Sequence, residues 1–143
     1  SLLAPDLGKQ YQVKKICDEN NIDFFAYSPL SFGILCIDPD KEENKEKSFI
    51  RNSLFENYKK PTYELRRCLK RIAHQRSVSQ AQVAINWCCY QGTIPLVGMR
   101  KKSQVIDVSN VFNWNLKKNE FKVLQEVSKK CLKKMPKNPF SSN

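Results

Sequence analysis

The residues best suited to chemistry lie between positions 93 and 104, where a short apolar run meets a glycine and a group of cations. Residues 93–97 are typical of a buried strand, and Gly98 after them would let the backbone approach a ligand closely. Arg100 offers a planar guanidinium that suits a phosphate. Residues 101–104 then begin a helix, whose free N–H groups and dipole favour an anion. The stretch predicts a phosphate site, although an ordinary strand-to-helix turn with a solvated basic edge would use the same residues.

Composition limits the kinds of partner that this chain can have. Its 143 residues, with a hydrophobic content of 41%, suffice for one domain with a real core. The formal net charge of +11 invites a nucleic-acid interpretation. However, the lysines are dispersed, and neither a zinc-finger spacing nor an RNA-binding aromatic motif accompanies them. We therefore expect no nucleic-acid partner.

Apolar segments and cysteines indicate the compartment. No apolar run reaches the ~20 residues of a membrane span, and the N-terminus lacks a signal-peptide pattern. The six cysteines show no CxxC pairing and no nearby histidines, so we expect neither a metal site nor a disulfide framework. Cys68, Cys88 and Cys131 fall at apolar positions of helical patterns and should be reduced core residues. These features predict a cytoplasmic protein without a membrane partner.

The first part of the chain must position this site through one strand and the loop after it. Residues 1–3 could be the tail of another strand, and residues 9–20 predict an amphipathic helix. The apolar run at residues 22–27 is typical of a strand buried on both faces, as in a parallel sheet. Residues 28–33 then leave it as a loop of small and polar residues. The apolar face expected for the helix comprises Val13, Ile16 and Cys17.

The middle of the chain is expected to be helical. A short helix is indicated around residues 53–55, and a stronger one runs from about residue 61 to residue 74. Ser77 and Gln80 form a capping box that would begin the next helix. Gly92 would close that helix, because glycine readily adopts the left-handed conformation found there.

Two more helices are predicted after the second strand, over residues 102–111 and 117–134. Helices of this length between buried strands imply parallel pairing through right-handed crossovers. Two or three strands cannot close a barrel, so the sequence predicts part of a larger α/β fold. The residues expected to face inward from the last helix are Phe121, Leu124, Val127 and Cys131.

Several motifs occur in a fixed order along the chain. They are AYSPLSFGIL at residues 26–35, QAQVAINW at residues 80–87 and QGTIPLVGMR at residues 91–100. Gln104 follows the last of these, and WNL at residues 114–116 precedes the last helix. In this order and spacing, the motifs resemble the C-terminal half of the aldo-keto reductase superfamily. The resemblance covers nearly the whole chain.

The resemblance implies an α/β fold, namely part of a TIM (β/α)8 barrel that binds NADPH. Residues 22–27 would be the seventh strand and residues 93–97 the eighth, with residues 1–143 forming the C-terminal portion of the domain. Loops after these two strands commonly hold phosphate in such barrels, which agrees with the site inferred above from the residues alone.

The resemblance also implies which residues bind the cofactor. Tyr27 resembles the aromatic residue near the nicotinamide. Gly98 and Arg100 resemble the backbone and the cation at the adenosine 2′-phosphate, while Gln104 and Asp107 resemble side chains around the adenine. The loop around the pyrophosphate would comprise Ser28, Pro29, Leu30, Ser31, Phe32 and Gly33.

One further arginine and two departures from the family pattern concern the same cofactor. Arg51, with Phe55 four residues later, resembles the family's RxxxF loop, and an arginine there would also reach phosphate. Residues 36–38 stand where the family often has Gly-Lys, so a carboxylate replaces one cation. Val108 stands where the family often has an asparagine beside the adenine.

No catalytic residue is expected in this chain. The family's Asp, Tyr, Lys and His lie on the first four strands of the barrel, and nothing in this sequence corresponds to them. His74 is the only histidine, and its place near a helix end suggests a structural role. The interpretation is a fragment of an NADPH-dependent reductase of aldehydes or ketones that carries the cofactor loops.

Two further expectations follow from this incompleteness. The first is an alternative function, a non-catalytic NADP-binding or regulatory subunit. The second concerns association: part of a barrel exposes apolar strand edges and a sheet face. We therefore expect the chain to oligomerise or to combine with a missing N-terminal half.

Overall fold

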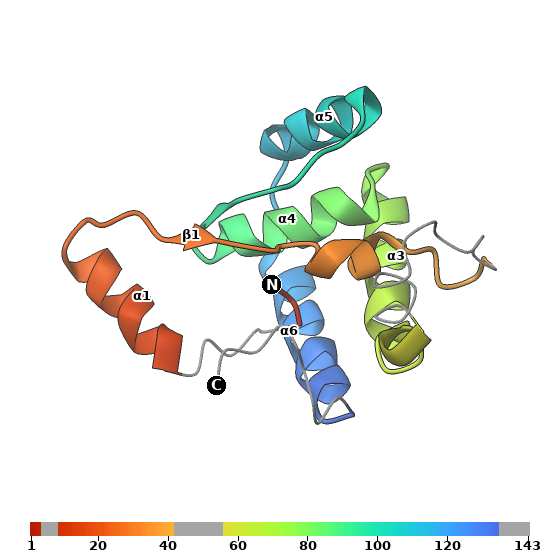
Figure 1. Ribbon diagram of the computed structural model, residues 1–143, viewed down its shortest axis with the longest axis horizontal. Coiled ribbons are helices and arrows are strands. Elements are labelled where there is room, and N and C mark those ends of the chain that lie inside the picture. The colour runs from red at the N-terminus through yellow and green to blue at the C-terminus, as the bar shows by residue number, and fades with distance from the viewer. Residues whose placement is uncertain (4–8, 42–55, 135–143) are drawn as a thin grey trace.

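A computed structural model of the chain describes residues 1–3, 9–41 and 56–134. Figure 1 shows a mostly helical arrangement, and the two short strands form one small sheet. The expected helix around residues 53–55 lies outside the described residues. The elements are α1 (Lys9–Glu19), β1 (Phe25–Ala26), the 3-10 helix η1 (Ser31–Cys36), α3 (Tyr63–Arg76), α4 (Gln80–Tyr90), β2 (Ile94–Pro95), α5 (Lys102–Ser109), the 3-10 helix η2 (Asn110–Asn113) and α6 (Lys118–Leu132).

The two strands pair in parallel, as the sequence predicts. Phe25 lies opposite Ile94 and Ala26 opposite Pro95. The amides of Ile94 and Leu96 each donate across the pair over 2.9 Å. Both strands are shorter than expected, and Pro95 has no N–H with which β2 could extend pairing at its outer edge. A small parallel sheet beside helices is compatible with part of a barrel.

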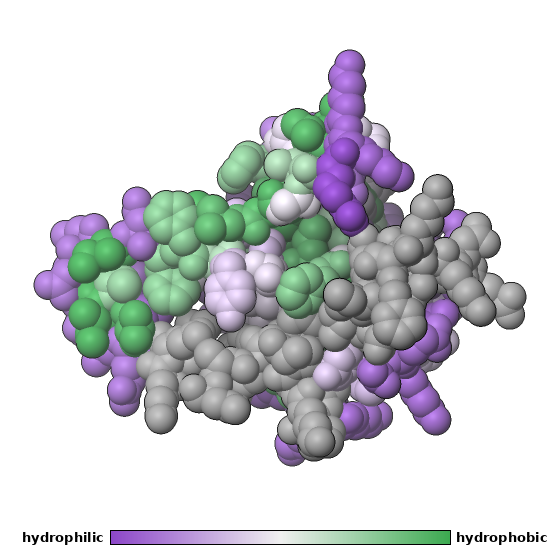
Figure 2. Space-filling model, viewed as in Figure 1, coloured by the Kyte–Doolittle hydropathy of each residue, from purple (hydrophilic) through white to green (hydrophobic). Residues whose placement is uncertain are grey.

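One face of this sheet is exposed, so the prediction of strands buried on both faces is wrong for this chain. Its large side chains remain 41–64% accessible, and Figure 2 shows apolar surface gathered over β1 and α1. The apolar face expected for α1 is likewise largely open among the described residues, because Val13 and Ile16 are 49% and 55% exposed. The exposed residues of the sheet face are Phe25, Tyr27, Ile94 and Leu96.

The core lies between α3, α4 and α6, with η1 and the N-terminal residues against it. Trp87 of α4 is buried and stacks on Phe121 of α6, with ring centroids 5.8 Å apart. Leu2 and Leu3 are also fully buried, and the hydroxyl of Ser128 donates to the Leu2 carbonyl. Residues 1–3 form a turn, so the expected strand tail is wrong. The inward residues predicted for α6 are confirmed as buried or half-buried.

The helix caps differ from the predicted ones at one point. Ser77 adopts a left-handed φ of 53° and ends α3, so its predicted role as the N-cap of α4 is wrong. Ser79 caps α4 instead, and its hydroxyl accepts a hydrogen bond from the amide of Gln82 at 3.1 Å. The Ser-x-x-Gln pattern recurs two residues later, which is why sequence alone misplaced it. Gly92, with a φ of 69°, follows α4 as predicted.

All six cysteines lie in the described ranges, and none of them forms a disulfide. Cys68, Cys88 and Cys131 are buried, which confirms their predicted place in the core. Burial raises the pKa of each of these three thiols, that of Cys131 to about 11. Within the described ranges, no three His, Cys, Asp or Glu side chains could hold a metal ion. No helix there is long and apolar enough to cross a bilayer.

An ion pair between α3 and α6 gives a prediction for pH dependence. Arg76 donates twice to Glu120, over 2.9 and 2.7 Å. Burial raises the pKa of Glu120, but hydrogen bonds from Arg76 and from the Lys117 amide outweigh it, so the pKa is lowered overall. A lowered carboxyl pKa contributes stability above the unfolded pKa, and this contribution disappears as pH falls through the folded pKa.

We therefore expect Glu120→Gln to lower the free energy of unfolding by about 1 kcal/mol at neutral pH. The difference from wild type should shrink toward zero on acidification below about pH 4. Urea titrations at several pH values measure this. Glu126→Gln, on the exposed side of α6, is the control. A constant difference at all pH values would contradict the assignment.

Candidate functional site

The candidate site is built from the two segments that leave the carboxyl ends of β1 and β2. Because the strands are parallel and Ala26 pairs with Pro95, both segments begin at the same edge of the sheet. In open and barrel-shaped parallel sheets this edge is where ligands bind. The structure thus brings together the starts of the two predicted binding segments, residues 27–33 and 98–104.

The first segment has an unusual backbone. Ser28, Ser31 and Phe32 all have a left-handed φ, between 49° and 56°, and Gly33 follows with 95°. Left-handed non-glycine residues cost about 1–3 kcal/mol each and persist where the surroundings impose them, often at ligand sites. Hydrogen bonds from Ser31 N to Ser28 O at 3.0 Å and from Gly33 N to Leu30 O at 2.9 Å close the turns. The sequence does not predict the left-handed conformation of the three non-glycine residues.

The side chains of this segment divide into anchors and presented groups. Pro29 and Ser31 are buried, and Ser31 shares a 2.6 Å hydrogen bond between hydroxyls with Ser1. Leu30 packs against the core. Phe32 and Tyr27, in contrast, are 57% and 64% exposed. A ligand would therefore meet the two rings and the backbone, while the buried side chains hold the loop in shape.

The second segment carries the glycine and the arginine. A Cβ built on Gly98 would meet no atom of the described residues within 4 Å, so these residues do not require glycine at this position. Arg100 is exposed, and the Gln104 side chain accepts hydrogen bonds from the amides of Arg100 at 2.8 Å and Lys101 at 3.0 Å. The Lys101 amide, predicted to be open to an anion, is therefore occupied. The Gln104 amide donates to the Lys101 carbonyl at 3.0 Å, so the amides of Lys102 and Ser103 are the ones that helix geometry leaves for an anion.

Asp107 lies on α5 and points toward α4. Its Oδ2 accepts from the Ser79 hydroxyl at 2.6 Å, and its Oδ1 accepts from the Gln82 side-chain amide at 2.7 Å. Both oxygens thus connect α5 to α4, and contact with an adenine stays a prediction. Ser79 and Gln82 were missed as partners of this segment, although a glutamine among the apolar residues of α4 is a visible signal. Arg51 lies outside the described residues.

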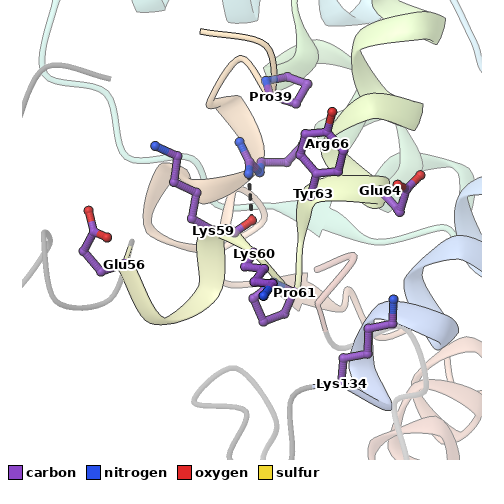
Figure 3. A pocket seen from close by; sticks show the side chains of 9 residues that line it. All are labelled: Pro39, Glu56, Lys59, Lys60, Pro61, Tyr63, Glu64, Arg66 and Lys134. Carbon is purple, nitrogen blue, oxygen red and sulfur yellow. Dashed lines mark hydrogen bonds between the residues drawn. The ribbon is translucent and has the colours of Figure 1, made fainter. Parts of the chain in front are cut away.

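A separate hollow of about 620 Å³ lies at the start of α3 (Figure 3). Arg66 is almost fully buried beside it and donates to the Lys59 carbonyl at 2.7 Å and the Thr62 hydroxyl at 3.2 Å. These bonds hold the chain that enters α3. The lining residues are Pro39, Glu56, Lys59, Lys60, Pro61, Tyr63, Glu64, Arg66 and Lys134, none of which belongs to the candidate site.

Comparison with known proteins identifies the class to which this fold and site belong. The sequence model of the Aldo/keto reductase family matches residues 3–129 of the chain. The match spans both strands and both candidate binding segments. The chain therefore belongs to the aldo/keto reductase family.

Individual relatives match most of the chain. The chain is 34% identical over 143 residues to the chloroplastic pyridoxal reductase of Arabidopsis thaliana, covering 99% of this chain and 38% of that protein. It is 25% identical over 122 residues to the (1S)-1,7-diacetoxy-luvungin A aldo-keto reductase of Citrus sinensis, covering 85% and 31% respectively. Protein REDOX 2 of Catharanthus roseus is 26% identical, with 83% of this chain and 30% of that protein covered. The chain spans 38% or less of each of these relatives.

Proposed function

We propose that the chain is the C-terminal, cofactor-binding portion of an NADPH-dependent aldo-keto reductase. The observation that carries this proposal is the parallel pairing of β1 with β2, which starts residues 27–33 and 98–104 at one edge of the sheet. Open space at Gly98 and the exposed guanidinium of Arg100 fit a phosphorylated dinucleotide. The cytoplasmic location expected from the sequence stays a prediction.

In the proposed reaction, NADPH supplies the hydride that reduces an aldehyde or ketone. The residues of this chain bind and orient: Arg100 and the start of α5 face the 2′-phosphate, and the 28–33 loop holds the pyrophosphate. Tyr27 and Phe32 offer exposed rings to the planar groups of the cofactor. We assign no proton donor among the described residues, and we place that role in the remainder of the parent protein.

The exposed sheet face fits the same proposal. Phe25, Ile94 and Leu96 form an apolar surface on a sheet whose two outer edges pair with no other strand in the described ranges. Such surfaces are normally covered. We propose that further strands of the parent protein cover this face, and that an isolated chain would instead self-associate through it.

The test compares cofactor binding with turnover. NADPH titrated into the chain, followed by nicotinamide fluorescence, should bind more tightly than NADH. The full-length product of the gene should reduce small aldehydes with NADPH, and pyridoxal is the first to assay because the Arabidopsis relative is named for it. Binding without reduction of any aldehyde or ketone would favour the alternative, a non-catalytic NADP-binding or regulatory subunit. Absence of dinucleotide binding would contradict both.

Gly98 gives a second prediction. Gly98→Val should weaken NADPH binding at least tenfold, because the side chain would fill the space where a ligand approaches the backbone. The free energy of unfolding should change by less than about 1 kcal/mol, since no atom in the described part of the chain lies within 4 Å of the added Cβ. Titration and urea denaturation measure the two effects. Equal binding by both proteins would show that no ligand lies against Gly98.

A further inference from the structure

Helix α5 contributes no side chain to the hydrophobic core that the described residues form. None of its residues is buried; of its three apolar side chains, Val105 and Ile106 are 50% and 56% exposed, and Val108 is half-buried. Most helices of globular proteins are held by an apolar face. Some other interaction must therefore determine where α5 lies, and with it the phosphate-binding turn that precedes it (Figure 1).

That interaction is a group of polar side chains between α5 and α4. Asp107 accepts from Ser79 at 2.6 Å and from Gln82 at 2.7 Å. The other end of the Gln82 amide accepts from the Trp114 indole N–H at 3.1 Å. Gln82 is only 5% exposed, so its orientation is determined by partners at both ends.

The same group connects to Arg100 through α5 itself. Asp107 lies in the last turns of the helix, while Gln104 in its first turn accepts from the Arg100 amide at 2.8 Å. Helix α4, which supplies the donors, also leads into β2 through Gly92. Helix α4 therefore helps to determine both where β2 ends and where Arg100 lies.

We propose that Asp107 is a positioning residue, held by Ser79 and Gln82, that fixes α5 and so places Arg100 for a 2′-phosphate. The identity of the ligand in this proposal rests on the proposed function. The attachment of α5 to α4 through Asp107 does not depend on it. In this proposal Asp107 affects cofactor binding by fixing the position of Arg100, and it does not itself contact the adenine.

The experiment compares Asp107→Ala, Asp107→Asn and Gln82→Ala in the intact chain. Asp107→Ala and Gln82→Ala should each raise the Kd for NADPH about tenfold and that for NADH less than about threefold, and the double variant should be no worse than either single one. Asp107→Asn keeps an acceptor and should restore most of the affinity. Ser109→Ala, which removes only a hydrogen bond to Ile106 within α5, is the matched control.

Two results would overturn the proposal. Equal losses for NADPH and NADH in Asp107→Ala, with no effect of Gln82→Ala, would indicate direct adenine contact, because Gln82 is buried. In Asp107→Ala and Gln82→Ala, we expect the amide hydrogen exchange of residues 102–109 to accelerate at least tenfold, without change in α6. Unchanged exchange there would show that the bonds of Asp107 to Ser79 and Gln82 do not hold α5 in place. Since exchange needs no ligand, it decides the attachment even if wild type binds neither dinucleotide and the proposed function fails.

Discussion

Replacing Arg100 by alanine should raise the Kd for NADPH between about tenfold and a hundredfold, while the Kd for NADH stays within about threefold. A guanidinium bonded to a phosphate contributes about 1.5–3 kcal/mol, and each 1.4 kcal/mol corresponds to a factor of ten. Only NADPH carries the 2′-phosphate that this side chain would contact. Fluorescence titration with the two dinucleotides at one salt concentration measures the ratio.

Arg67→Ala is the matched control for this measurement. Arg67 is also an exposed arginine, but it lies on α3 over the Tyr63 ring, 5.8 Å from the ring centroid. Its loss lowers the net charge of the chain by the same amount without touching the candidate site. If both variants weakened NADPH equally, the general positive charge of the protein would explain binding. Equal losses for NADPH and NADH in Arg100→Ala would remove the phosphate role.

Replacing Asn86 by alanine should lower the free energy of unfolding by about 3 kcal/mol. The side chain is 3% exposed. Its Nδ2 donates to the carbonyls of Val111 at 3.2 Å and Trp114 at 2.8 Å, and its Oδ1 accepts from the Leu116 amide at 3.0 Å. Alanine makes none of these bonds, so three buried or half-buried backbone groups lose their hydrogen-bond partner. Two of these groups belong to the link between η2 and α6. Urea denaturation with an unchanged m-value measures the loss.

Two comparisons show whether the hydrogen bonds cause this loss. Asn86→Asp keeps the acceptor for Leu116 but turns a negative charge toward two carbonyl oxygens, so it should be at least as destabilising as alanine. Asn115→Ala removes an exposed amide from the same link and should cost less than about 0.5 kcal/mol. A loss below about 1 kcal/mol for Asn86→Ala would contradict the role given to these bonds.

The sequence predicted the elements well where a local signal determines them. The 3.6-residue apolar pattern located α3, α4 and α6, and Gly92 marked the end of α4 because only glycine adopts its conformation without cost. The predicted parallel pairing of the strands is confirmed. Burial of the sheet could not be judged in the same way, because it depends on what lies opposite Phe25 and Leu96. Apolar residues of a partly covered sheet look the same in sequence as those of a complete one.

The site could be predicted only in part, for a related reason. Residue types and spacing placed Ser28, Gly98 and Arg100 in the two segments that begin at one edge of the sheet. Ser31 and Phe32 adopt left-handed conformations that their residue types do not predict, because glycine is the residue that favours them. Likewise, the bonds of Asp107 to α4 span more than twenty residues and follow from how two helices meet.

Alkylation of the buried thiols would measure how often the chain unfolds. Cys68, Cys88 and Cys131 are hidden from reagents, and their raised pKa values leave almost no nucleophilic thiolate at neutral pH. Cys36 lies on the surface. A brief pulse of an alkylating mass tag would therefore mark Cys36 in every molecule and the three core sulfurs in unfolded molecules only.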